Sequence, residues 1–226
     1  MKKFVFIALF SLSLIPAFSQ QSEVRQVGSF RGVKAGEAID VYLKKGDKES
    51  VKVEVTGTAL SNVLTEISGS YLRIHMKDGN YHNRNVKVYV TYVALERISA
   101  SSAANIFSEN VIKAGAMEIS ASSAATVEVS LDAQGLMLDV SSAGDIRLEG
   151  KTQKLEVEAS SAGSIDAYNL VAENVTATAS SAGSIKLTVT KEFQADASSA
   201  GSIRYRGTPM KTNTDSSSGG SVKKSN

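Results

Sequence analysis

The chain has 226 residues, with 25 basic and 23 acidic side chains and no cysteine. This near balance of charge argues against a nucleic-acid partner held by a basic surface. The missing cysteine excludes a disulfide framework and a lipid carried on a cysteine, so we expect packing alone to hold the core.

The first residues are typical of a secretory signal peptide. Two lysines, Lys2-Lys3, precede an apolar run over residues 4–15, and Ala17-Phe18-Ser19 is a small-x-small cleavage site. We expect residues 1–19 to be removed on export from a bacterial cell, leaving the protein in the periplasm, on the cell surface or outside the cell. An uncleaved anchor is the alternative, but the run is short for a bilayer. No second apolar stretch long enough to span a membrane follows, so we expect no integral membrane segment in the mature chain.

The segment 24–95 contains strand-like alternation without a repeated corner. Apolar and polar residues alternate over residues 38–43, 51–55, 71–75 and 86–93. Such alternation is typical of strands with one buried face. A stack of strands needs its ends covered. We therefore expect this segment to form an irregular N-terminal cap and the first coils of a repeat array.

A Ser-Ser-Ala or Ser-Ser-Gly corner recurs through the second half of the chain. Its copies start at residues 101, 122, 141, 160, 180, 198 and 217, at intervals of 18 to 21 residues. Two alternating strands per repeat predict an all-β fold. We expect a right-handed parallel β-helix, or β-solenoid, with coils of about 19 residues and two main sheets joined by Ser-Ser-Ala-Gly corners. A stack of antiparallel hairpins is the alternative.

The corners have a predicted chemistry of their own. Alanine is expected to fill the inside of each bend, glycine to adopt positive φ, and the serine hydroxyls to hydrogen-bond along the stack or to local backbone. A second corner in each repeat varies in sequence and is expected to be looser. The predicted structural corner residues are Ser141, Gly144, Ser160, Gly163, Ser180, Gly183, Ser198 and Gly201.

These patterns predict one solenoid domain over residues 24–206, with the regular repeats in 96–206. Residues 207–226 are polar and rich in serine and glycine. We expect them to form a last weak coil that frays into a disordered tail.

Parts of the chain resemble a known family. The sequence Val-Gly-Ser-Phe-Arg-Gly-Val at 27–33, the strand pattern at 36–43 and 86–90, and the Ser-Ser-Ala-Gly corners are similar to the head GIN domain family of auto-transporter adhesins. The family's Gly-Ile-Asn motif is present only as Ala38-Ile39-Asp40. The resemblance covers nearly the whole mature chain. It implies a β-helical fold, export and an adhesion role, without the catalytic residues of β-helical enzymes.

The sequence offers little for catalysis. A nucleophilic serine needs a base within hydrogen-bond reach, and the only histidines, His75 and His82, precede every corner. Asp145 and Asp166 could approach each other on adjacent coils, but surface carboxylates are usually solubilising. We therefore expect no catalytic residues, no metal site and no cofactor.

Side chains suited to ligand binding occur together in the polar connection over residues 77–85. It interrupts two apolar strands, as recognition loops do on rigid scaffolds, and Tyr81, His82 and Arg84 are its candidate ligand-binding residues. The leading hypothesis is an exported, non-enzymatic binding or adhesion module of the cell envelope, whose partner is a glycan or a host or cell-surface protein. A periplasmic structural or self-associating scaffold is the alternative. A polysaccharide-acting enzyme is less favoured.

Overall fold

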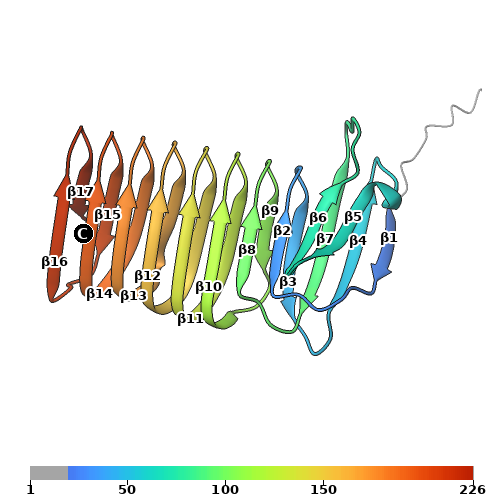
Figure 1. Ribbon diagram of the computed structural model, residues 1–226, viewed down its shortest axis with the longest axis horizontal. Coiled ribbons are helices and arrows are strands. Elements are labelled where there is room, and N and C mark those ends of the chain that lie inside the picture. Colours follow the sequence, from blue (N-terminus) through green and yellow to red (C-terminus); the bar gives the residue numbers. More distant parts are fainter. Residues whose placement is uncertain (1–19, 226) are drawn as a thin grey trace, which may run out of the picture.

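The computed structural model describes residues 20–225, so the predicted signal peptide lies outside the described residues. The described chain forms an elongated prism of stacked β-coils (Figure 1). In each regular coil, one strand leads up to a sharp corner and the next strand leads away from it. We call the strands that enter the corners the first sheet and the strands that leave them the second sheet.

Parallel pairing runs through the whole regular array. Ile106, Val127 and Ile146 occupy equivalent positions in successive coils and are fully buried. The coils wind in a right-handed sense (Figure 1). The predicted parallel β-solenoid is thereby confirmed, and the hairpin alternative is wrong for this region. The strands are β8 (Arg97–Ala100), β9 (Asn105–Ser108), β10 (Ile112–Ala121), β11 (Thr126–Val140), β12 (Asp145–Ala159), β13 (Ser164–Ala179), β14 (Ser184–Ala197), β15 (Ser202–Arg206), β16 (Lys211–Ser216) and β17 (Ser221–Lys224).

The second corner of each central coil is a bend within a continuous strand. Strand β11 pairs with β12 from Thr126 to Val140, and the pairing carries on through the bend. Each of β11 to β14 therefore starts in the second sheet and ends in the first sheet of the next coil. Two short strands joined by a loose corner were expected here. The backbone instead keeps its hydrogen bonds with the neighbouring coil, which satisfies polar groups that a loop would leave unpaired.

The Ser-Ser-Ala-Gly corners are tight turns that differ from the prediction. In one copy the Gly144 N–H donates to the Ser141 carbonyl oxygen at 2.9 Å, and Ser142 and Ala143 have φ of 49° and 58°. Two successive positive φ values are the geometry of a type I′ turn. Alanine, not glycine, takes the left-handed conformation, and Ala143 is exposed at the tip rather than filling the bend.

Ala104 and Ala125 take the fourth position of the first two corners, and glycine takes it in the later corners for a reason other than positive φ. A Cβ on Gly144 would lie 2.6 Å from the Ala121 carbonyl oxygen of the preceding coil. The alanine that fills the inside of the corner comes just before the serines, since Ala121 and Ala159 are buried. The fourth corner residue therefore permits close approach of two backbones, which is a separate use of glycine from positive φ.

Backbone hydrogen bonds tie neighbouring corners together. The Ala143 N–H donates to the Ser161 carbonyl oxygen at 3.1 Å, and the Ala162 N–H donates to that of Ser181 at 3.0 Å. The same bond recurs at other described corners. Main-chain groups therefore form this ladder, whereas the sequence suggested serine hydroxyls. The hydroxyl and methyl groups at the tips are left facing solvent along one edge of the prism.

The N-terminal cap is irregular, as predicted, and its strands are stacked out of chain order. The pair β2–β3 lies between β6–β7 on one side and β8–β9 on the other, with parallel pairing. Beyond it, β1, β4 and β5 pair antiparallel and close this end. No helix within residues 20–225 is long and apolar enough to cross a membrane. The cap elements are β1 (Gln21–Arg25), β2 (Gly32–Ala35), β3 (Asp40–Lys45), β4 (Ser50–Thr56), the 3-10 turn η1 (Leu60–Asn62), β5 (Val63–Ser68), β6 (Tyr71–Met76) and β7 (Asn85–Tyr92).

The array continues beyond residue 206, where a last weak coil fraying into a disordered tail was expected. Strands β16 and β17 pair in parallel with β14 and β15, and a corner at Ser217 joins them. Every side chain of β16 is exposed. The strands of this last coil are held by backbone hydrogen bonds to the coil beneath. Charged residues such as Lys211 and Asp215 on the outermost strand oppose edge-to-edge pairing with other chains.

One buried hydroxyl in the cap gives a stability prediction. Tyr92 is 2% exposed, its hydroxyl has no hydrogen-bond partner within residues 20–225, and burial raises the pKa of the phenol. The Tyr92→Phe variant should be more stable by about 1 kcal/mol, because a buried unpaired polar group is removed. Above about pH 10 the unfolded chain releases this proton more readily than the folded chain, so wild-type stability should fall and the variant should lack that loss. Thermal melts at pH 7 and pH 10.5 test both effects, and a less stable variant at pH 7 contradicts them.

Candidate functional site

The loop that carries the predicted binding residues connects β6 and β7 and rises above the row of corners (Figure 1). Tyr81 is half-buried and packs against the core, whereas His82 is exposed. The Arg84 guanidinium lies 5.8 Å from the Tyr81 ring centroid and donates to the Glu37 carbonyl oxygen at 2.7 Å. Two of the three predicted residues therefore hold the loop on the cap, and only His82 projects freely from it.

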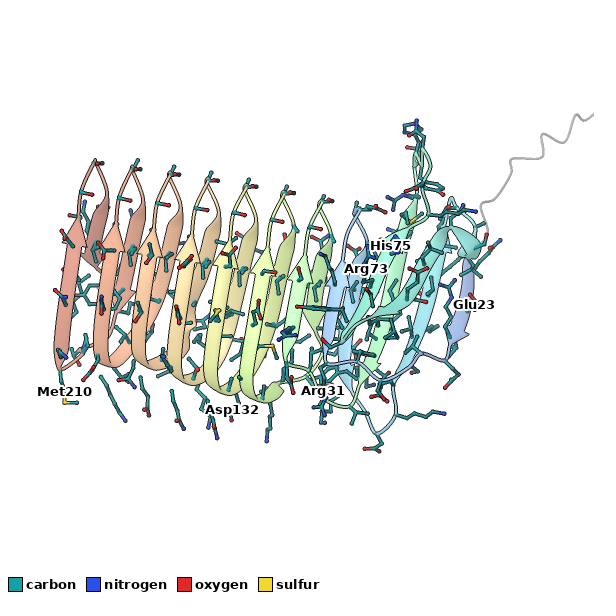
Figure 2. The ribbon with its side chains drawn as sticks, viewed as in Figure 1. Glu23, Arg31, Arg73, His75, Asp132 and Met210 are labelled. Atoms are coloured by element: carbon teal, nitrogen blue, oxygen red, sulfur yellow. The ribbon has the colours of Figure 1, made fainter. Side chains whose placement is uncertain are left out.

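The two histidines belong to different segments, His75 to β6 and His82 to the loop that follows it. His75 lies on β6 below the loop (Figure 2), with its ring nitrogens 3.0 Å from the Met76 carbonyl oxygen and 3.4 Å from a Glu66 carboxylate oxygen. It also borders a cavity of about 130 Å³ shared with Ser101. Within residues 20–225 no group of three His, Cys, Asp or Glu side chains could hold a metal ion.

Asp145 and Asp166 do not form a carboxylate pair. The strand register sets Asp145 opposite Ser164 and Asp166 opposite Arg147, so the two acids occupy different rows of the second sheet. Arg147 lies 3.0 Å from the Asp145 carboxylate, and Lys186 lies 3.2 Å from that of Asp166. Each acid is balanced by a neighbouring base, as the surface interpretation predicted.

A stack of aromatic rings stands on the outer face of the second sheet. The ring centroids of Tyr89 and Tyr42 are 5.1 Å apart, and those of Tyr42 and Phe107 are 5.4 Å apart. The stack exists because β3 lies between β7 and β9, which aligns these three residues in one row. All three rings are half-buried although they point away from the core. We call this row the aromatic ladder.

The two ends of the aromatic ladder differ. Beyond Tyr89, the Lys52 ammonium lies 5.6 Å from the ring centroid and 2.7 Å from the Glu54 carboxylate. The hydrogen bond between this pair lowers the pKa of Glu54 and raises that of Lys52. At the other end the ladder stops at Phe107, because the next residue in the row is Glu128. The Phe107 ring therefore has one face without an aromatic neighbour.

That end of the aromatic ladder borders an open groove of about 460 Å³, which we call the Phe107 groove. Its polar side chains contact one another. Arg147 lies 3.8 Å from the Glu128 carboxylate, and the Ser130 hydroxyl donates to Glu149. The groove crosses four neighbouring strands, β9, β11, β12 and β13. It is lined by Phe107, Ser108, Glu128, Val129, Ser130, Arg147, Leu148, Glu149, Asp166 and Asn169.

A tyrosine with two basic neighbours stands next to this groove on the same face. Irregular pairing of β13 with β12 and β14 places Tyr168 where the Arg206 guanidinium lies 4.0 Å from its ring centroid, with Lys186 at 5.9 Å. The Tyr168 hydroxyl is 2.8 Å from that of Ser225. The side chains around Tyr168 are thus mutually supported, which gives the groove a rigid border.

Residues 29–209 match the family model described as "Putative auto-transporter adhesin, head GIN domain". The chain belongs to this head GIN family. The predicted family resemblance is therefore confirmed over most of the described residues. Among proteins with curated descriptions, none matches the chain.

Solved structures show the same fold for the head GIN domain. A crystal structure of a putative adhesin from Bacteroides fragilis has a TM-score of 0.85 at 22% identity, covering 92% of this chain and 98% of that one. A putative adhesin from Parabacteroides merdae has a TM-score of 0.68 at 16% identity, with 92% and 96% covered. A structure called a putative lipid binding protein, from Parabacteroides distasonis, has a TM-score of 0.67 at 17% identity, with 92% and 97% covered.

Sequence reasoning did not find the aromatic ladder or the Phe107 groove of this head GIN domain. Tyr42, Tyr89 and Phe107 lie far apart in the chain, and their contact depends on the out-of-order insertion of β3. One signal was present. All three occupy outward positions of the alternating pattern, where a polar residue is the usual choice, and aromatic residues there indicate a surface with a role.

Proposed function

We propose that this head GIN protein is exported from a bacterial cell and acts as a non-enzymatic binding module of the cell envelope. The observation that carries the proposal is a rigid two-sheet scaffold with an aromatic ladder and an open groove on one outer face. Rigid strands hold such a surface in place before a partner arrives, which lowers the entropic cost of binding. Its adhesin-named relatives support this reading.

Several features support binding rather than turnover. Each acid and base of the Phe107 groove is engaged with a neighbouring side chain, and no His lies in its lining. His75 makes its ring contacts within the cap. Hydrolysis by a serine nucleophile requires a base within hydrogen-bond reach, and the groove lining offers no histidine for that role. The geometry favours a surface that recognises a glycan or a cell-surface protein.

Export and surface exposure are tested together by cell fractionation with protease shaving. The proposal expects the protein in envelope or extracellular fractions, with removal by protease added to whole cells. A protein found in the cytoplasm contradicts export. A protein protected in whole cells but digested after outer-layer disruption places the module in the periplasm, which contradicts a role in adhesion.

The 77–84 loop remains a proposed contact site, and its variant gives a binding prediction. A triple variant that combines Tyr81→Ala, His82→Ala and Arg84→Ala should weaken binding of the purified protein to partner cells about tenfold. Truncation of contacting side chains in an interface commonly lowers affinity by about this factor. Flow cytometry with labelled protein measures the effect.

Two further variants interpret that result. His82→Ala alone changes an exposed contact without the packing of Tyr81 or the hydrogen bond of Arg84, so a loss here identifies direct contact. Thr176→Ala alters an exposed residue of the first sheet and should bind like the wild type. Equal binding by the triple variant and the wild type rules out the loop as the contact.

A further inference from the structure

We propose that the Phe107 groove binds an uncharged oligosaccharide, with one sugar ring stacked on the Phe107 side chain. This inference rests on the proposed binding function and names the ligand class and the site. It follows from the position of the aromatic ladder, the chemistry of the groove lining and the size of the groove.

The aromatic ladder supplies an apolar surface where the sheet otherwise faces water. Tyr42 is covered by a ring on each side, and Lys52 approaches the far side of Tyr89. Phe107 is the one aromatic residue in the groove lining, and it sits next to Glu128 in the row. A pyranose has an apolar C–H face and a rim of hydroxyls, so it can cover an aromatic face and still keep its polar rim paired.

The groove lining matches the polar rim of such a sugar. Glu128, Glu149 and Asp166 offer carboxylate acceptors, and Arg147 and Asn169 offer donors. Each sugar hydroxyl both donates and accepts, so it can use both kinds of group. Charged partners strengthen these hydrogen bonds relative to neutral ones.

The charge of the lining decides between sugar classes. The lining holds three carboxylates and one guanidinium, and Lys186 is paired with Asp166 at its border, so one negative charge is left in excess. An acidic sugar would bring like charges together in a partly enclosed site, which opposes binding. An uncharged oligosaccharide has no such penalty.

The size of the groove indicates more than one sugar unit. About 460 Å³ lies in the range of pre-formed small-ligand sites, which run from about 300 to 1,000 Å³. The groove crosses four strands, and four strands at about 4.8 Å spacing span roughly 14 Å. A short oligosaccharide laid along the solenoid axis would reach from Phe107 toward Asn169.

Direct binding of defined sugars tests the inference. Cellotetraose, mannotetraose and chitotetraose serve as uncharged probes and tetragalacturonate as the acidic probe, measured by titration calorimetry and by saturation-transfer NMR. We expect at least one uncharged probe to bind and the acidic probe not to bind. Binding of the acidic probe alone, or of no probe, overturns the inference.

Variants locate the site. Phe107→Ala should weaken binding of the uncharged probe about tenfold or more, and Phe107→Tyr should stay within about threefold because a ring face remains. Glu128→Gln should weaken binding about fivefold through loss of a charged acceptor. Thr176→Ala on the first sheet is the matched control. Circular dichroism verifies the fold, and a folded Phe107→Ala that binds as well as the wild type contradicts the proposed site.

The outcome for this site is separable from the outcome for the proposed function. A protein that binds cells through another surface, with no uncharged probe bound, refutes the oligosaccharide site alone. A protein that binds a probe through Phe107 but stays in the cytoplasm refutes the envelope function and leaves the site standing.

Discussion

The Gly183→Ala variant should unfold with a free energy about 2–4 kcal/mol lower than that of the wild type. A Cβ at this corner position would lie 2.6 Å from the carbonyl carbon of Ala159 and closer still to its oxygen. The obstacle is the backbone of the neighbouring coil, which also holds the Ser180 N–H by a 2.9 Å hydrogen bond. Relief of the clash therefore requires two coils to separate locally.

A series of glycine variants tests this explanation by denaturant unfolding. The nearest atoms to a built Cβ lie at 2.9 Å for Gly163 and 2.6 Å for Gly144, so the cost should rise from Gly163 through Gly144 to Gly183. Gly135→Ala is the matched control, since its Cβ would meet nothing within 4 Å. Equal destabilisation by Gly183→Ala and Gly135→Ala would show that close approach of two backbones does not explain the corner glycines.

The repeat made the solenoid predictable because it joins two independent signals. Period-two alternation predicts one-sided strands, and a corner every 18 to 21 residues predicts their stacking. Ile146, Ile165 and Ile185 occupy matching positions and form the buried column that the repeat implies. Handedness followed from the general preference of parallel crossovers.

Corner conformation was not predictable from residue type alone. Glycine is the usual residue at positive φ, so the pattern favoured Gly144 over Ser142 and Ala143. In the structure, the hydrogen bond from Ala143 to Ser161 on the next coil holds the strained residues in place. Tertiary contacts of this kind override local preference, at a cost of about 1–2 kcal/mol for each left-handed residue.

The two candidate sites also differ in whether the sequence could predict them. The 77–84 loop was visible because a polar stretch interrupts two strands in the sequence. The Phe107 groove was not visible, because Phe107 and Tyr42 become neighbours only when β3 is inserted beside β9. Chain order predicts contacts within a regular array, where neighbours in sequence are neighbours in space. It fails in the cap, where spatial order and chain order diverge.

The Phe193→Ala variant should lose about 3–5 kcal/mol of stability, with the loss concentrated in the last coil. Phe193 is 2% exposed on β14, and its ring centroid lies 4.6 Å from that of Tyr205. It is aligned between Val175 on β13 and the exposed Thr212 on β16. Phe193 therefore ends an apolar column, and the ring covers the C-terminal end of the core.

A solenoid couples each coil mainly to its neighbours, so the site of damage should be measurable. Native-state hydrogen exchange should show lost protection in β15, β16 and β17 of Phe193→Ala, with protection kept in β8 to β12. Val157→Ala, in the middle of the array, is the matched core variant and should lower global stability without selective fraying of the end. Uniform loss of protection from β8 to β17 in Phe193→Ala would show that the array unfolds as one cooperative unit, because nearest-neighbour coupling predicts a local effect.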